Sequence, residues 1–138
     1  MTTDHLFVFG TLLSGYDHPM ARMLSKEAAL LGEAHCTGKL YLVKHYPGIV
    51  LSNDPADVVF GELLRMRDPK TLLKKLDKYE GCGEGATQPT EYVRQLVNVT
   101  LADGAARQAW TYVYNWPVAH LPRIASGRFL DHVSGKHD

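Results

Sequence analysis

The sequence predicts an α+β fold in which strands dominate, and three segments carry that prediction. Residues 6–9 form an unbroken apolar run, which is typical of a strand buried on both faces. Residues 93–101 alternate between apolar and polar side chains, turn at 102–105 and return at 107–114, as a β-hairpin does. Residues 69–79 repeat leucine at helical spacing, which predicts an amphipathic helix between the strands.

The first strand ends at Gly10, and glycine can adopt backbone angles that other residues avoid. Beyond this strand the amides of Gly10, Thr11 and Leu12 are free to face a ligand instead of a neighbouring strand. Converging amides suit a carboxylate or a developing oxyanion. We therefore take this turn as a candidate binding site, with an ordinary exit from strand to loop as the alternative.

One short helix and three strands are predicted between this turn and the amphipathic helix. The short helix begins at Pro19, because proline suits the first helical position, and apolar residues follow at helical spacing as far as Leu24. The strands are expected at about 32–43, at 49–51 and at 58–66. Residues 53–55, Asn-Asp-Pro, form the turn between the last two.

The amphipathic helix has recognisable ends. Asp68 can cap its first turn, Pro69 occupies its first position, and Gly81 ends it as a left-handed cap. Its buried face is expected to consist of Leu72, Leu73, Leu76 and Tyr79, and its solvent-exposed face of Lys74, Lys75 and Lys78.

Glu80 does not fit the pattern of this helix. It lies four residues beyond Leu76 and seven beyond Leu73, which places its carboxylate on the apolar face, near the end where the helix dipole disfavours negative charge. Both effects raise the pKa of a carboxyl group, and burial is usually the larger. Such a group is a good proton shuttle, so Glu80 is the candidate catalytic residue. The alternative is a frayed helix end with Glu80 in water.

Other side chains lie where packing explains them as well as binding does. Tyr92 and Tyr114 could line a pocket, although aromatic residues on paired strands more often belong to the core. Asp77 is expected to cap or to pair with a basic residue, and Arg94 to form a surface ion pair. We expect the activity to depend on Glu80 and on the amides of the first turn.

The remaining segments indicate one domain over residues 1–138, with no repeat, low-complexity tract or boundary. The glycine-rich loop at 81–89 can either fold over a pocket or serve as a plain connector. Residues 116–138 are expected to be loop and a short final helix, followed by a polar tail that is disordered from about residue 131.

Composition argues against several classes of function. The chain carries 15 basic and 15 acidic residues and no basic stripe, so no nucleic-acid partner is expected. Cys36 and Cys82 fit reduced thiols better than a disulfide framework. No secretion signal or apolar run of membrane-spanning length is present, so we expect a cytoplasmic protein without a membrane partner. The histidines have no ligand-like spacing and no nucleotide-binding motif occurs, so neither a metal nor another cofactor is expected.

Two motifs make the chain similar to a known family. The segment Phe9-Gly10-Thr11-Leu12 resembles the Tyr-Gly-Thr-Leu that ends the first strand in the γ-glutamylcyclotransferase-like family, in particular its AIG2-like and γ-glutamylamine cyclotransferase branch. The segment Leu76-Asp77-Lys78-Tyr79-Glu80-Gly81 matches the family's Leu-Asp-x-Tyr-Glu-Gly, which holds the catalytic glutamate. Weaker similarities follow the family order at 46–50, 59–63, 91–94 and 124–129. The resemblance therefore extends from Leu6 to Phe129.

This resemblance implies a fold and a chemistry. The family fold is a small mixed β-barrel with flanking short helices, a closure that periodicity alone does not reveal. The implied substrate is a γ-glutamyl amide whose own α-amine attacks the γ-carbonyl, which forms 5-oxoproline and releases an amine or amino acid. Glu80 would be the general acid and base, and Phe9, Gly10, Thr11 and Leu12 would bind the substrate. Phe9 replaces the usual tyrosine, so that hydroxyl is absent here.

Two other functions fit the same residues. One is a non-catalytic module that binds a small molecule, and the other is an enzyme that removes a γ-glutamyl protecting group in a biosynthetic pathway. An acid on an apolar face favours catalysis, whereas the change to Phe9 favours the binding module. The intramolecular attack needs no cofactor, because good orientation alone supplies on the order of 7–11 kcal/mol of the barrier. No motif specifies the leaving group or an oligomeric state.

Overall fold

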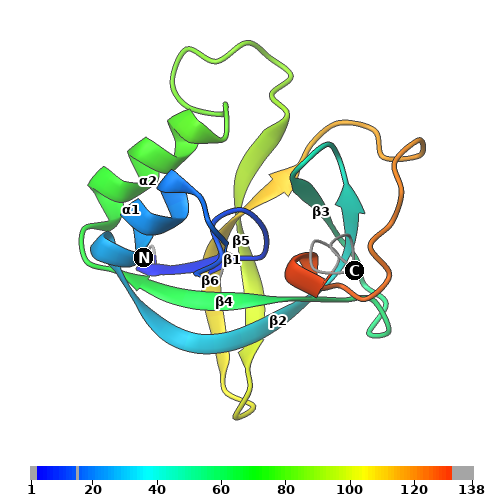
Figure 1. Ribbon diagram of the computed structural model, residues 1–138, viewed down its shortest axis with the longest axis horizontal. Helices are drawn as coiled ribbons and strands as arrows, with labels where there is room; N and C mark the ends of the chain where they lie inside the picture. Colours follow the sequence, from blue (N-terminus) through cyan, green and yellow to red (C-terminus); the bar gives the residue numbers. More distant parts are fainter. Residues whose placement is uncertain (1–2, 15, 132–138) are drawn as a thin grey trace.

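The computed structural model describes residues 3–14 and 16–131, and Figure 1 shows the path of the chain. The elements in chain order are β1 (His5–Val8), α1 (Pro19–Glu27), β2 (Ala28–Leu42), β3 (Pro47–Leu51), β4 (Val58–Met66), α2 (Pro69–Tyr79), β5 (Tyr92–Leu101) and β6 (Ala106–Tyr114). Strands therefore dominate, as the sequence predicts.

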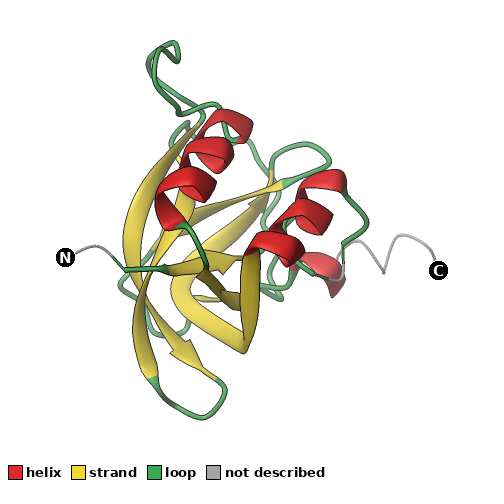
Figure 2. Cartoon of the chain, turned by 90° about the vertical axis from the view of Figure 1, so that its left-hand side faces the viewer, coloured by secondary structure: helices red, strands yellow, loops and turns green. Residues whose placement is uncertain are grey.

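Five of the strands close into a barrel, which confirms the fold that the family resemblance implies. They follow the order β2-β4-β1-β6-β5, and β5 pairs back onto β2 through Ala34 with Leu101 and His35 with Thr100. β3 extends the wall by pairing with residues 38–42 of β2. All pairings are antiparallel except that of β1 with β6, so the barrel is mixed. Seen from the side, the strands curve into one wall and the helical segments lie outside it (Figure 2).

β1 lies inside the wall between β4 and β6. Its residues Leu6, Phe7 and Val8 are almost completely buried, which confirms the strand predicted from the apolar run. β1 pairs with β4 over its whole length but with β6 through one register pair, Leu6 with Trp110. The Thr111 hydroxyl adds a second link to β6 by donating a hydrogen bond of 2.9 Å to the Phe7 carbonyl oxygen.

β2 begins four residues earlier than the sequence suggests. Residues 28–31 follow α1 directly, and Ala28 pairs with Met66 at the end of β4. A bulge between Leu30 and Gly32 restores the register, and Gly32 has a φ of 145°. The boundary was missed because the run Ala-Ala-Leu-Leu has no strand alternation, and only pairing with β4 makes it extended.

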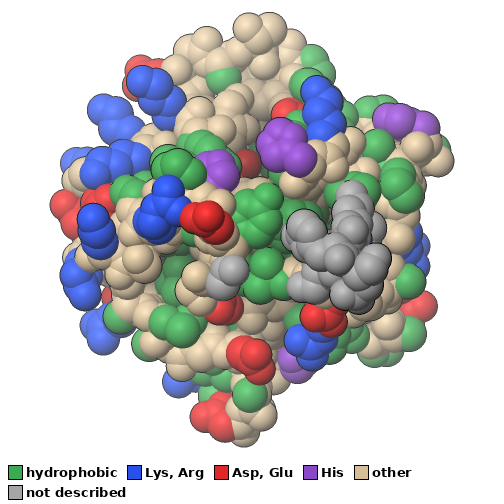
Figure 3. All heavy atoms as spheres, in the orientation of Figure 1, with side chains coloured by type: hydrophobic (Ala, Val, Ile, Leu, Met, Phe, Trp, Pro, Cys, Tyr) green, Lys and Arg blue, Asp and Glu red, His purple; other side chains and the backbone are tan. Residues whose placement is uncertain are grey.

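α2 has the ends and most of the faces that the sequence predicts. The Thr71 amide donates to Asp68 Oδ1 at 3.3 Å, and Gly81 ends the helix with a φ of 74°. The buried residues are Leu72, Leu73 and Leu76. Lysine and arginine side chains gather over α1 and α2, at the left of the face in Figure 3.

Tyr79 is the exception, because the prediction that it is buried was wrong. Its side chain is 39% exposed. The ring packs edge-on against His18 and the hydroxyl reaches Thr11. Tyr79 therefore lies at the rim of the barrel and not in its core.

The second half of the chain contains the predicted hairpin, in which β5 and β6 pair from Tyr92 with Tyr114 to Thr100 with Ala106. A loop over 81–91 connects α2 to β5, at the top of Figure 1. A final helical turn begins at Phe129, whereas the predicted disordered tail lies outside the described residues from 132 onward. Within the described ranges, no helix combines the length and apolar character needed to cross a membrane.

Leu76 tests how firmly α2 is attached to the barrel. Its side chain is completely buried, so Leu76→Ala should lower the free energy of unfolding by about 2–5 kcal/mol. The matched truncation Lys74→Ala, on the exposed face of the same helix, should change it by less than about 0.5 kcal/mol. Urea denaturation measures both values, and equal losses would contradict the packing of α2 described above.

Candidate active site

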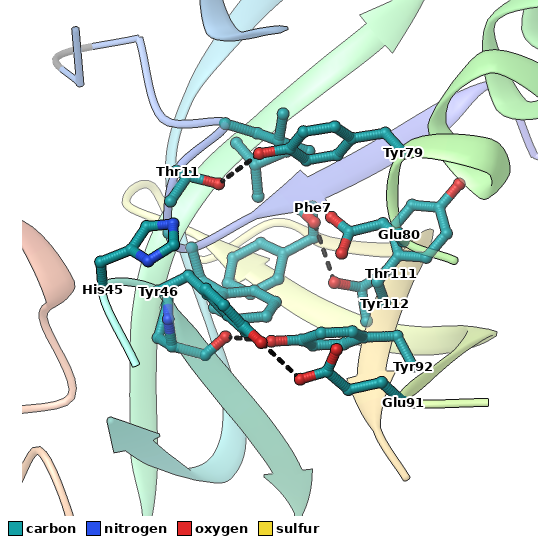
Figure 4. A pocket seen from close by; sticks show the side chains of 15 residues that line it. Phe7, Thr11, His45, Tyr46, Tyr79, Glu80, Glu91, Tyr92, Thr111 and Tyr112 are labelled. Atoms are coloured by element: carbon teal, nitrogen blue, oxygen red, sulfur yellow. Dashed lines mark hydrogen bonds between the residues drawn. The ribbon is translucent and has the colours of Figure 1, made fainter. Parts of the chain in front are cut away.

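A cavity of about 250 Å³ opens where β1 ends, beside the last turn of α2 (Figure 4). Its walls come from β1 and the turn that follows, the start of β3, the end of α2, and the neighbouring ends of β5 and β6. It is lined by Phe7, Val8, Phe9, Gly10, Thr11, Leu12, His45, Tyr46, Pro47, Tyr79, Glu80, Glu91, Tyr92, Thr111 and Tyr112. Pockets for drug-sized ligands commonly span about 300–1,000 Å³, so a cavity just below this range suits a smaller molecule.

Glu80 directs its carboxylate into this cavity from the C-terminal end of α2 (Figure 4). The side chain is partly buried. Burial and, to a smaller extent, the nearby charge of Glu91 together raise the pKa of the Glu80 carboxyl group from 4.5 to about 7. The sequence predicts the first of these causes but not the second. A carboxyl group with a pKa near 7 can both accept and donate a proton at neutral pH.

Glu91 is a second acid in the cavity wall, and the sequence analysis did not identify it. It directly precedes β5, and its Oε2 accepts a hydrogen bond of 2.6 Å from the Tyr46 hydroxyl. Tyr46 directly precedes β3, so two loops that are distant in sequence meet here (Figure 4). The only sequence signal was the weak motif at 91–94, whose similarity to the family depends on Tyr92 and Arg94.

The turn after β1 brings Gly10, Thr11 and Leu12 to the cavity wall. The Leu13 amide closes this turn by donating to the Gly10 carbonyl oxygen at 3.0 Å. Within residues 3–14 and 16–131, the amides of Gly10, Thr11 and Leu12 donate to no backbone carbonyl. These three amides therefore lack a main-chain partner and can donate to a ligand or to water.

Gly10 is required for a reason that differs from the prediction. Its φ is not positive, so the expected need for unusual backbone angles was wrong. A Cβ atom at this position would instead lie 2.5 Å from Pro47 Cγ and 2.8 Å from Pro47 Cδ. Glycine therefore allows the turn to approach the start of β3, a contact between distant segments that sequence cannot reveal.

Phe9 and Thr11 connect the turn to its surroundings. Phe9 is 8% exposed, and its ring lies next to that of Phe7 with 6.2 Å between the centroids, so it belongs to the core as well as to the cavity wall. Thr11 Oγ1 lies 3.3 Å from the Tyr79 hydroxyl, which joins the turn to the end of α2.

Asp77 joins α2 to the barrel directly beside the cavity. Its Oδ1 accepts a hydrogen bond of 2.7 Å from the Tyr112 hydroxyl and lies 2.9 Å from Arg94 Nε. The Arg94 guanidinium group also stacks over the Trp110 ring at 4.6 Å. The predicted pairing of Asp77 with a basic residue is confirmed, but the pair is half-buried, so the expectation of a surface ion pair for Arg94 was wrong.

The other candidates divide between the cavity and the scaffold. Tyr92 lines the cavity and donates a hydrogen bond of 2.6 Å to the Pro47 carbonyl oxygen, whereas Tyr114 packs behind it. None of the loop residues 81–89 lines the cavity, so the loop does not cover it. In the described part of the chain, no three histidine, cysteine or acidic side chains gather as a metal site would require.

These features define a small mixed β-barrel with flanking helices and a cavity for a small molecule. A family profile described as gamma-glutamyl cyclotransferase, AIG2-like, matches residues 6–131. The gamma-glutamylcyclotransferase family protein ytfP of Citrobacter rodentium is 36% identical over 129 residues, which cover 91% of this chain and 95% of that protein. The chain therefore belongs to the AIG2-like gamma-glutamyl cyclotransferase family.

Solved structures agree with this assignment. The solution structure of protein ytfP from Escherichia coli has a TM-score of 0.61 at 35% identity, and the match covers 94% of this chain and 98% of that one. The crystal structure of an AIG2-like protein from Mus musculus has a TM-score of 0.70 at 23% identity, with 91% of this chain and 88% of that one covered. The second similarity concerns the fold alone.

The pKa of Glu80 predicts how stability depends on pH. Between pH 4.5 and about 7 the folded protein holds a proton that the unfolded chain has released, so the contribution of Glu80 to stability falls as the pH rises through this window. Glu80→Gln removes this penalty. It should raise the free energy of unfolding by about 1–3 kcal/mol near pH 8 and change it little near pH 4.

Urea denaturation at both pH values measures this effect. Glu84→Gln, at an exposed acid in the following loop, is the matched control and should show no such pH dependence. If Glu80→Gln changes the free energy of unfolding by the same amount at both pH values, the Glu80 carboxylate is solvated in the folded protein.

Proposed function

We propose that this protein is a cyclotransferase that cleaves a γ-glutamyl amide through attack by the substrate's own α-amine. The products are 5-oxoproline and the free amine or amino acid. Glu80 serves as general base and then as general acid. The amides of Gly10, Thr11 and Leu12 hold substrate oxygens, and Phe9 forms part of the wall beside them.

In the proposed reaction two protons leave the substrate α-nitrogen and two reach the leaving nitrogen. The Glu80 carboxylate accepts a proton from the substrate α-ammonium group, and the freed nitrogen forms a bond to the γ-carbonyl carbon. The carbonyl oxygen becomes an oxyanion, which backbone amides stabilise. The oxyanion then reforms the carbonyl group as the bond to the leaving nitrogen breaks, and Glu80 gives its proton to that nitrogen. The Glu80 carboxylate then takes the second proton from the attacking nitrogen, which leaves the neutral lactam, and this proton passes to the released amine. The charges and atoms balance without a further reactant.

One observation carries the proposal: a carboxyl group with a pKa of about 7 shares a small cavity with three backbone amides that are available to a ligand. A proton shuttle works best when its pKa is near the working pH. Family membership supports the same chemistry, because the matching profile is described as a gamma-glutamyl cyclotransferase. We also propose that residues 1–138 act as one domain, since the profile covers 6–131.

Two alternatives use the same cavity. Removal of a γ-glutamyl protecting group would follow the same steps and differ only in the leaving amine. A binding module without catalysis would use the turn but would gain nothing from a carboxyl group that is costly to ionise. The raised pKa of Glu80 therefore favours an enzyme.

Release of 5-oxoproline is the direct test. The purified protein, incubated with γ-glutamyl amines, amino acids and peptides, should produce 5-oxoproline that mass spectrometry detects. Glu80→Gln should lower turnover at least about 100-fold, because a positioned acid–base group typically contributes that much or more. The wild-type rate should also fall as the pH drops below about 7, where Glu80 becomes protonated.

Glu84→Gln is the control for this experiment and should retain full turnover. Unchanged turnover in Glu80→Gln would remove Glu80 from the mechanism. An acidic limb near pH 4.5 would mean that the base has an ordinary carboxyl pKa. If no substrate yields 5-oxoproline, the binding module becomes the better proposal.

Gly10→Ala tests the binding role of the turn. A methyl group there collides with Pro47, so the turn must move and its amides lose their positions. We expect the affinity for a γ-glutamyl amide to fall at least about tenfold, or 1.4 kcal/mol. Calorimetry on the Glu80→Gln background measures it without turnover. Gly83→Ala is the control, because its nearest neighbour, Lys78 N, lies at an ordinary 3.4 Å. Equal affinities would contradict the role of the turn.

A further inference from the structure

We propose that His45 is a further substrate-binding residue, which donates a ring N–H group to the α-carboxylate of the γ-glutamyl group. In its protonated form the ring also supplies a positive charge at this end of the cavity. The inference rests on the proposed function and deepens it, because it names a side chain that recognises the charged part common to all γ-glutamyl amides. The spacing of the histidines in the sequence did not single out this residue.

The charges in the cavity wall are the first argument. The 15 lining residues include two carboxylic acids, Glu80 and Glu91, and neither lysine nor arginine. Of these described lining residues, His45 alone has a side chain that can carry a positive charge near neutral pH. A carboxylate that leaves water for a site with two acids needs hydrogen bonds and a compensating charge. The backbone amides of Gly10–Leu12 provide hydrogen bonds but no full charge.

The second argument is the way in which charge is distributed around the cavity. Glu80 follows α2 and Glu91 precedes β5, whereas His45 belongs to the turn between β2 and β3. In Figure 4, His45 lies with Thr11 on one side of the cavity, and the two acids lie on the other. The γ-glutamyl group carries an ammonium and a carboxylate group on the same carbon. This distribution directs the ammonium group toward Glu80, as the proposed reaction requires, and the carboxylate toward His45.

The position of the His45 ring is the third argument. The ring packs edge-on against the Tyr46 ring, with 5.1 Å between the centroids. Tyr46 is in turn fixed by the hydrogen bond that its hydroxyl group donates to Glu91. The next residue, Pro47, lies so close to Gly10 that a Cβ atom at Gly10 would be 2.5 Å from Pro47 Cγ. The turn that carries His45 and the turn that carries the free amides therefore form one side of the site together.

The fourth argument is that the ring nitrogens of His45 are available. His5 and His18 use their ring nitrogens in hydrogen bonds within the protein. Across residues 3–14 and 16–131, by contrast, no protein group hydrogen-bonds to the ring of His45. The residue is also exposed, so the binding of a ligand breaks no hydrogen bond that the ring makes to the protein.

Two ligands that differ in one group test the inference. One is the γ-glutamyl amide of butylamine, and the other is the same molecule with a neutral carboxamide in place of the α-carboxylate. Calorimetry on the Glu80→Gln background measures both affinities without turnover. His45→Gln should weaken binding of the γ-glutamyl amide at least about fivefold and binding of the carboxamide less than about twofold. His45→Arg, which restores a positive charge, should recover most of the affinity for the γ-glutamyl amide.

Lys44→Gln is the matched control, because it removes a positive charge from the neighbouring exposed residue, which does not line the cavity. It should weaken binding of either ligand by less than about twofold. Equal losses for the two ligands in His45→Gln would overturn the inference, because the ring would then only support the shape of its turn. So would an equal loss in Lys44→Gln, an affinity in His45→Arg no better than in His45→Gln, or no binding of the γ-glutamyl amide.

Release of 5-oxoproline by the wild-type protein separates this inference from the proposed function. If no γ-glutamyl amide yields 5-oxoproline but His45→Gln still weakens binding of the γ-glutamyl amide selectively, the proposed function fails and the binding role of His45 stands. If 5-oxoproline is released and His45→Gln leaves both affinities unchanged, the proposed function stands and the inference is wrong.

Discussion

The contact of Asp77 with Arg94 and Tyr112 is the interaction on which the site depends. It connects the last turn of α2 to β5 and β6, and Glu80 follows three residues later. The pair is half-buried. Removal of either side chain would therefore leave the other charge partly desolvated and without an ion-pair partner, which destabilises the fold. The aspartate of the Leu-Asp-x-Tyr-Glu-Gly segment thus has a structural purpose that is separate from the chemistry proposed for the glutamate.

The turn after β1 depends on close contacts with β4 in a similar way. The Glu62 carboxylate accepts hydrogen bonds from the Ser14 amide at 2.8 Å and from the Ser14 hydroxyl at 2.6 Å. A Cβ atom at Gly61 would lie 2.1 Å from the Val8 carbonyl oxygen, so only glycine lets β4 pass β1 so closely. The weaker motif around 59–63 therefore explains the position of the turn, although none of its residues lines the cavity.

The cavity holds two carboxylic acids close together, which is electrostatically unfavourable, and the fold keeps them there. Two acids, Glu80 and Glu91, line the cavity without a lysine or arginine in its wall, and each reduces the electrostatic cost in a different way. The raised pKa of Glu80 lets it hold a proton near neutral pH, whereas Glu91 is stabilised by the Tyr46 hydroxyl. Clusters of perturbed titratable groups in a concave site are typical of function, because they lower stability and packing does not require them.

Local spacing and caps are enough to predict the element types, both ends of α2, the hairpin and the position of Glu80 on an apolar face. Five other features are set by long-range contacts: the closure of the barrel, the early start of β2, the exposure of Tyr79, the contact of Gly10 with Pro47 and the place of Glu91 in the cavity. Each of these depends on groups far apart in the chain. Glu91 meets Tyr46 across 45 residues, and β5 reaches β2 through Leu101 and Ala34. Local sequence patterns carry no information about contacts between residues so far apart in the chain. The sequence therefore predicts the role of Glu80 but not the presence of a second acid, Glu91, in the same cavity.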